Sequence, residues 1–224
     1  MSKILHIETA TKVCSVALSE NGNIVERIEN EEEGFSHAEN LNLFIVKALD
    51  KAGWKLSQLN AVSVTSGPGS YTGLRIGVST AKGLCYALNI PLISVNALES
   101  ISALAREKHQ NKSICAVIDA RRMEVFSLIT DRNNTIVKAI SADVIEENTY
   151  SAHSNLVICG DGAEKLQGIW KNRDFIFETN IKSSAGGQCK IAYEKYSAKQ
   201  FEDVAYFEPF YLKDFIAVKA KKRV

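Results

Sequence analysis

The sequence has little net charge and no long apolar run. Its 224 residues carry a formal net charge of +1 at pH 7, which predicts no strong global attraction to nucleic acid or to a membrane. It contains no run of about 18 apolar residues that could span a bilayer. The first residues, MSKILHIETAT, lack the basic segment and long apolar run of a signal peptide. We therefore expect a cytoplasmic protein without a membrane partner.

Cysteine and histidine motifs are also missing. The five cysteines stand singly, without C-x-x-C or a short Cys/His spacing for zinc. An odd number without a framework is typical of reduced thiols in a cytosol. None of the four histidines has another histidine four residues later, so the sequence offers no helical metal pair. We expect neither a bound metal nor a cofactor.

Three familiar motifs fail in the glycine-rich segment GPGSYTGLR at 67–75. A P-loop needs a lysine directly after its last glycine, where this sequence has Leu74. The dinucleotide motif G-x-G-x-x-G fails because Thr72 stands where the third glycine belongs. The hydrolase elbow G-x-S-x-G fails because the spacing around Ser70 is wrong.

Alternating apolar residues predict three antiparallel strands at the start of the chain. The tight turn between the second and the third is expected at Asn21-Gly22. The three strands are expected over 3–10, 14–20 and 23–30.

A helix is predicted to follow, because Ser36 and Glu39 have the spacing of a capping box. It should end at Gly53. Leu43 and Val46 fall outside its apolar stripe. That stripe consists of Ala38, Leu41, Ile45, Leu49 and Ala52.

A strand over 59–67, a helix from Ser70 to Leu88 and a strand over 91–96 come next. Strand, helix and strand with short joints predict a parallel crossover. A further helix is expected over 98–108.

A second round of the same order follows. Strands, with turns at Arg121-Arg122 and Asn133-Asn134, are expected over 113–120, 124–131, 135–145 and 157–160. A helix should begin at Ala163, residues 179–190 should form a loop, and a last helix is expected over 188–200. These repeats indicate a duplicated architecture.

The helix after Ser70 has a face of small residues, Gly73, Gly77 and Thr80. Glycine inside a helix costs about 1 kcal/mol relative to alanine, so close approach of another backbone is favoured over a phosphate cradle. The apolar stripe beside it is Leu74, Val78, Ala81, Cys85 and Leu88. The remaining stripe, which suits solvent or a partner protein, is Arg75, Ser79, Lys82 and Tyr86.

Residues at strand ends are candidates for nucleotide binding, each with a structural alternative. Hydroxyl groups at Thr9 and Thr11 could bind phosphate or serve the turn. An acidic residue beside two arginines could hold a nucleotide with its metal or form a surface ion-pair cluster. A glycine pair before a helix could lie along the edge of a bound nucleotide or form a tight turn. These residues are Asp119, Arg121, Arg122, Gly160 and Gly162.

The C-terminal segment AVKAKKRV is basic, with Lys219, Lys221, Lys222 and Arg223. It could contact RNA phosphate or form a solvated tail.

The sequence resembles one family, the TsaB (YeaZ) proteins of tRNA threonylcarbamoyladenosine biosynthesis. The resemblance covers most of the chain and is densest in SGPGSYTGLRIGVSTAKGLCYAL at 66–88. It continues through PLISVNALES and is supported by ILHIETATKVCSVAL, FSHAENL, AVIDARRMEVF and EPFYLKDF.

The resemblance implies an α/β fold of the two-lobed actin, sugar-kinase and Hsp70 type, in which mixed RNase H-like sheets are flanked by helices. The expected lobes are 1–105, which carries a helical interface, and 106–224, whose tail can return to the first lobe. The implied role is that of a noncatalytic subunit that supports a TsaD-like catalytic subunit. A TsaE-like ATPase is a further implied partner, tRNA is reached indirectly, and a homodimer can form through the same helices.

One departure argues against catalysis. The TsaD paralogues that the sequence resembles place two metal-binding histidines in V-N-H-L-E-G-H, where this chain has VNALESI at 95–101. Ala97 and Ile101 therefore stand where the ligands would be, and neither can bind a metal. We expect no catalytic residue and no metal site, and the resemblance gives no support to a glycoprotease.

The resemblance assigns the helices that start at Ser36 and Tyr71 to a subunit interface. The residues expected there are Leu43, Val46, Arg75, Ser79, Lys82 and Tyr86. The alternative is an ATP-binding or ATP-hydrolysing enzyme of the same superfamily, for which Glu8 and Asp119 are the candidate carboxylates.

Overall fold

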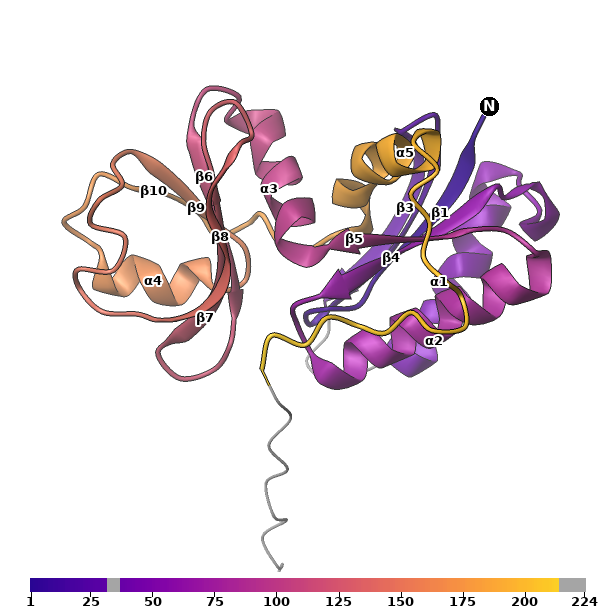
Figure 1. The fold of residues 1–224 in the computed structure, drawn as a ribbon, viewed down its shortest axis with the longest axis horizontal. Coiled ribbons are helices and arrows are strands. Elements are labelled where there is room, and N and C mark those ends of the chain that lie inside the picture. The colour runs from indigo at the N-terminus through magenta and orange to yellow at the C-terminus, as the bar shows by residue number, and fades with distance from the viewer. Residues whose placement is uncertain (32–36, 214–224) are drawn as a thin grey trace, which may run out of the picture.

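Two lobes, each built on a five-stranded mixed sheet, make up the computed structural model (Figure 1), which describes residues 1–31 and 37–213. The predicted helix cap at Ser36 and the basic cluster at 219–223 lie outside the described residues. No helix within the described ranges is long and apolar enough to cross a membrane.

The first sheet has the strand order β3-β2-β1-β4-β5. β1, β2 and β3 pair antiparallel, and β4 and β5 join parallel to β1. The predicted antiparallel start of the chain and the predicted parallel crossover are therefore confirmed. The strands are β1 (Lys3–Glu8), β2 (Val13–Glu20), β3 (Asn23–Glu31), β4 (Ala61–Gly67) and β5 (Leu92–Asn96).

Helices α1 (His37–Ala52) and α2 (Tyr71–Leu88) share one hydrophobic cluster on one face of this sheet. The apolar stripe of α1 differs from the prediction, because Ala38 is exposed and Ala48 is buried. His37 takes the place of Ala38: its buried ring donates from Nε2 to the Thr11 carbonyl at 2.8 Å. A polar residue satisfied in this way is invisible to an apolar pattern.

The second sheet repeats the first, with the order β10-β9-β6-β7-β8. Helix α4 (Ala163–Ile169) packs on one face and α3 (Ala97–Lys108) on the other. The duplicated architecture is therefore confirmed. The strands are β6 (Ser113–Asp119), β7 (Glu124–Thr130), β8 (Ile136–Val144), β9 (Leu156–Cys159) and β10 (Ile176–Glu178), of which β10 was not predicted.

The chain then crosses back to the first sheet. The predicted loop over 179–190 contains a buried 3-10 turn, η2 (Ala185–Gln188), and α5 (Cys189–Ser197) covers the face of the first sheet opposite α1 and α2. A short turn, η1 (Leu56–Gln58), precedes β4. Residues 198–213, named the strap here, run from α5 along α2 toward the second lobe (Figure 1). The first lobe is thus completed by residues beyond 185.

Candidate functional site

The glycine-rich segment is a packing site for the turn after β1. A Cβ atom at Gly73 would lie 2.1 Å from the Thr9 carbonyl oxygen, and one at Gly77 would lie 2.3 Å from Thr9 Oγ1. The Thr9 hydroxyl also donates to the Gly73 carbonyl at 2.8 Å. Close approach of another backbone, that of the β1–β2 turn, is therefore confirmed at Gly73. At Gly77 the close neighbour is the Thr9 side chain of the same turn.

Thr9 and Thr11 are both buried in this turn. Thr9 is committed to Gly73, and Thr11 Oγ1 accepts from the Val13 amide at 3.2 Å. Both hydroxyl groups thus already serve the hairpin. They offer a phosphate little unless the turn rearranges.

The corresponding turn of the second lobe collects charged groups at the carboxyl ends of β6 and β9. The Asp119 amide donates to Asp161 Oδ1 at 3.1 Å. Lys165 Nζ, from α4, contacts Asp119 Oδ1 at 2.5 Å and the Glu124 carbonyl at 2.6 Å. The structure brings Asp119 beside the Gly160–Gly162 loop, as a nucleotide site would require. Lys165 and Asp161 were not singled out from the sequence, although Asp161 lies between the two glycines that were.

Gly160 and Gly162 are also explained by packing. Gly160 has φ +109°, and a Cβ there would lie 2.0 Å from the Val117 carbonyl oxygen. A Cβ at Gly162 would meet Val125 and Val117 side chains at 3.2 and 3.3 Å. These glycines therefore let the β9–α4 loop approach β6, whatever else the loop binds.

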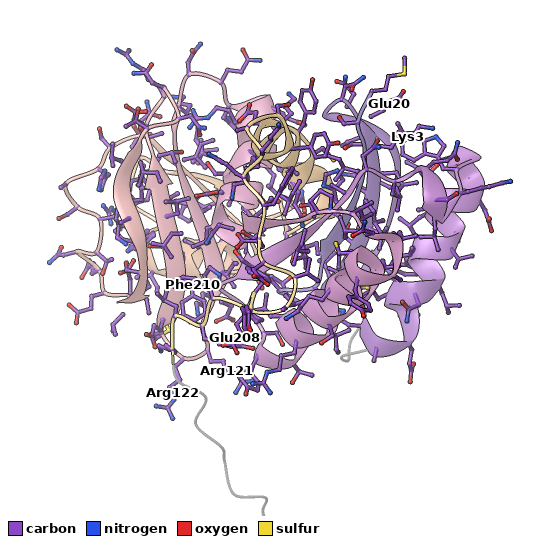
Figure 2. All side chains as sticks on the ribbon, turned by 45° about the vertical axis from the view of Figure 1, so that its right-hand side comes forward. Lys3, Glu20, Arg121, Arg122, Glu208 and Phe210 are labelled. Atoms are coloured by element: carbon purple, nitrogen blue, oxygen red, sulfur yellow. The ribbon has the colours of Figure 1, made fainter. Side chains whose placement is uncertain are left out.

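Arg121 and Arg122 form the outer corner of the same turn. Both have left-handed backbone conformations, with φ of 69° and 49°. Both side chains are exposed, and Figure 2 shows them at the lower edge of the molecule, near the end of the strap. Neither guanidinium has a hydrogen bond or ion pair to any residue within the described ranges.

Two acidic groups near this corner have pKa values above their ordinary range. Burial raises the pKa of Glu8, whose carboxylate accepts from Thr65 Oγ1 at 2.5 Å and from the Ala10 amide at 2.6 Å. Burial also raises the pKa of Asp161 to about 6. Thr65 and Ala10, which donate to the Glu8 carboxylate, belong to the same lobe as Glu8. Their hydrogen bonds order the β1–β2 turn.

The outer faces of α1 and α2 expose large apolar side chains. Leu43 and Val46 on α1 are 65% and 57% exposed, and Tyr86 on α2 is 86% exposed. The two helices lie side by side on one face of the sheet (Figure 1). Three such side chains on one helical layer make a surface that suits a protein partner.

The polar stripe of α2 has a different environment. Arg75 Nε donates to the Tyr211 hydroxyl at 3.1 Å, and its guanidinium lies 4.1 Å from the Tyr71 ring centroid. Lys82 Nζ donates to the carbonyls of Ala205 and Phe207 at 3.0 and 3.1 Å. The strap therefore occupies both side chains, and a cavity of about 260 Å³ remains between strap and helix, beside Ser79. The predicted interface divides into an open apolar part and a part held by the strap.

Ala97 and Ile101 lie at the start of α3, fully buried in the hydrophobic cluster that joins α3 to the second sheet. Their side chains fill the core with carbon atoms. Within the described residues, no group of three or more His, Cys, Asp or Glu side chains is placed to hold a metal ion.

Comparison with known proteins decides the family. Residues 28–214 match the family model for TsaD, the tRNA N6-adenosine threonylcarbamoyltransferase. The TsaB protein of Escherichia coli is 26% identical over 97% of this chain and 97% of its own length. The chain belongs to the TsaD family, in its TsaB (YeaZ) branch. A tRNA N6-adenosine threonylcarbamoyltransferase of Geotalea daltonii is 45% identical to this TsaB-like chain over 64 residues, covering 29% of the chain and 19% of that relative.

Solved structures agree with this assignment. YeaZ from Pseudomonas aeruginosa superimposes with a TM-score of 0.79 at 22% identity, covering 95% of the TsaB-like chain and all of the YeaZ chain. The activator of a 2-hydroxyisocaproyl-CoA dehydratase from Clostridium difficile, a structure with bound ADPNP, gives 0.55 at 11% identity, covering 90% of this chain and 98% of its own. The predicted two-lobed fold, with mixed sheets flanked by helices, is confirmed.

Proposed function

We propose that this chain is a noncatalytic subunit of the assembly that adds the threonylcarbamoyl group to tRNA. Its relatives are named for tRNA threonylcarbamoyladenosine biosynthesis. In this proposal it binds a TsaD-like catalytic subunit through α1 and α2 and supports its activity. The observation that carries the proposal is the exposure of Leu43, Val46 and Tyr86 on one helical layer.

Energetics favour these three residues as anchors. Burying a Leu or Val side chain completely contributes roughly 1.5–3 kcal/mol, and aromatic residues are enriched among interface hot spots. The 86% exposure of Tyr86 leaves most of its ring area for a partner to cover. Arg75 and Lys82 border the proposed interface, where a partner would meet the strap as well as the helix.

The noncatalytic part of the proposal rests on α3. Alanine and isoleucine have no lone pair to offer a cation, and here Ala97 and Ile101 are core residues. A catalytic centre built on a metal at those positions would require both to be replaced and the core to open. The proposed role is therefore performed through binding.

The apolar surface of α1 and α2 also suits a second partner, another copy of the chain. A second copy of the chain can cover the exposed apolar layer when the TsaD-like subunit is absent, so the two complexes compete. A TsaE-like ATPase would join the assembly, and tRNA would be modified at the catalytic subunit. Adding the catalytic subunit should therefore reduce the homodimer population.

The test is a binding measurement between this chain and the TsaD-like subunit of the same organism. The variant L43D/Y86D should bind at least about tenfold more weakly, since each charge would be buried without a partner at the interface. The matched control is V137D, at a side chain 51% exposed on β8 in the other lobe, which should bind as the unchanged chain does. Equal affinity of all three proteins would refute the chosen surface.

A second candidate function is nucleotide binding between the lobes. It is supported by the convergence of Asp119, Asp161 and the Gly160–Gly162 loop at the carboxyl ends of β6 and β9. In this proposal Asp119 would hold the metal ion of Mg-ATP, and the Gly160–Gly162 loop would lie beside the phosphates. Calorimetry with Mg-ATP tests it: affinity that disappears in D119A supports the site, and no heat of binding by the folded chain removes it.

A further inference from the structure

We propose that the turn at 119–122 is a direct contact for the phosphate backbone of tRNA, made by the Arg121 and Arg122 guanidinium groups. This inference rests on the proposed function for the identity of the nucleic acid. It adds a binding surface in the second lobe, on the turn between β6 and β7.

The turn is held so that both arginine side chains face outward. The Arg121 amide donates to Asp119 Oδ1 at 2.7 Å, and the Arg122 carbonyl accepts from Lys165 Nζ at 3.1 Å. Left-handed backbone is unfavourable for a residue that has a Cβ. Two consecutive arginines maintain it here because Lys165 and Asp119 fix the backbone around them.

Among the residues that the structure describes, the two arginines of the corner lack ion pairs, whereas two neighbouring carboxylates have them. Asp119 pairs with Lys165, and Glu124, at the start of β7, pairs with Lys213. Asp119 and Glu124 therefore do not pair with the arginines. Within the described part of the chain, Arg121 and Arg122 have no anionic partner, so two guanidinium groups are available for phosphates.

The end of the described chain lies at the same corner. The Lys213–Glu124 pair places the end of the strap two residues from Arg122, and Figure 2 shows Arg122 beside the point where the described chain ends. Because Lys213 is paired with Glu124, Arg121 and Arg122 are the groups that a polyanion would contact here.

Acidic groups beside the turn favour a ligand that stays on its outer side. Asp161 accepts from the Asp119 amide and lies close enough to the buried Glu8 to raise its pKa, whereas the Arg121 and Arg122 side chains are exposed. A nucleic-acid backbone can use the outer guanidinium groups alone.

The test uses an unmodified tRNA transcript and the complex of this chain with its TsaD-like subunit, with affinity measured by fluorescence anisotropy over a range of salt concentrations. The variant R121N/R122G removes both charges, and Asn and Gly accept left-handed backbone, so the turn should remain folded. Affinity at low salt should fall about tenfold, and the slope of log K against log salt should decrease by about 1–2.

The matched control is R132A, which removes an exposed arginine from the turn at the other end of β7. It should leave both affinity and slope unchanged. The charge-preserving variant R121K/R122K should retain most of the slope, because lysine also neutralises phosphate. A slope equal to that of the unchanged complex in R121N/R122G would overturn the proposal.

Two further measurements separate this inference from its alternatives. R121N/R122G should bind the TsaD-like subunit normally, so that a lost tRNA contact is not mistaken for a lost subunit interface. Mg-ATP binding, measured by calorimetry, should also be unchanged by R121N/R122G. Weaker ATP binding with unchanged tRNA binding would assign the arginines to a mononucleotide and overturn the proposal.

Discussion

Gly73 shows how one residue decides the geometry of the glycine-rich segment. Its missing side chain admits the Thr9 carbonyl, which lies 2.1 Å from where a Cβ would be. The sequence predicted a close approach from the unusual cost of glycine in a helix. It could not predict that the approaching backbone is a β-turn, because this contact joins residues far apart in the chain.

We predict that G73A destabilises the protein by about 2 kcal/mol, because the added methyl group collides with backbone that cannot rotate away. The matched control is G83A on the same helix, where a Cβ would meet nothing within 4 Å. That change should stabilise by up to about 1 kcal/mol. Chemical denaturation measures both, and equal stabilities for the two variants would contradict the packing role of Gly73.

The raised pKa of Asp161 predicts that the stability of the protein depends on pH. Burial raises its pKa to about 6 from an ordinary value of 3.8. The folded state therefore holds this proton more tightly than the unfolded state between pH 4 and 6. Its contribution to stability falls as pH rises through that window, and the loss is complete above about pH 6.

D161N should remove this loss while keeping the acceptor for the Asp119 amide. The free energy of unfolding of the variant minus that of the unchanged protein should grow by about 2 kcal/mol from pH 4 to pH 6. D50N, at an exposed position of α1, should show no such growth. A difference for D161N that stays flat across the window would show that Asp161 titrates normally.

At the scale of elements, the predictable parts are those with a strong period. The strands and helices of both rounds have clear apolar patterns. The three-residue β10 and the turn η2 have too few residues to show a period. The strap is held by isolated contacts, such as the Phe210 amide to the Ser66 carbonyl at 2.7 Å, which leave no pattern in the sequence.

The candidate site was predictable in part from the sequence. Exposure of Leu43, Val46 and Tyr86 follows from their positions off the apolar stripes, and the structure agrees. The environment of Arg75 and Lys82 was not predictable, because their contacts come from the strap, more than a hundred residues later in the chain. The tertiary return of the chain decides which polar residues of α2 remain open.

We predict that K82M loosens the strap, because Lys82 holds the Ala205 and Phe207 carbonyls. Loss of these charged hydrogen bonds at a half-buried site should cost about 1 kcal/mol and speed hydrogen exchange of the strap amides about fivefold. The control K47M changes an exposed lysine on α1. Unchanged exchange over residues 203–210 in K82M would show that Lys82 does not hold the strap.

At the scale of the whole molecule, the two lobes have the same strand order and different surfaces. The first exposes an apolar helical layer, which we propose binds a protein partner, and the second exposes an arginine corner where the strap ends. The strap contacts α2 in the first lobe and Glu124 in the second. In the proposed assembly the chain therefore binds protein with one lobe and RNA with the other.

Reconstitution of the modification reaction tests the central claim most directly. Threonylcarbamoylated tRNA would be measured by mass spectrometry in reactions that contain tRNA, an activated threonylcarbamoyl donor, ATP, the TsaD-like subunit, the TsaE-like ATPase and either this chain, V137D, L43D/Y86D or no addition. A further reaction contains this chain as its sole protein. We predict product only with the unchanged chain or the V137D control, and none from this chain alone. Product from the chain alone, or full activity in its absence, would contradict a noncatalytic role that acts through the α1 and α2 surface.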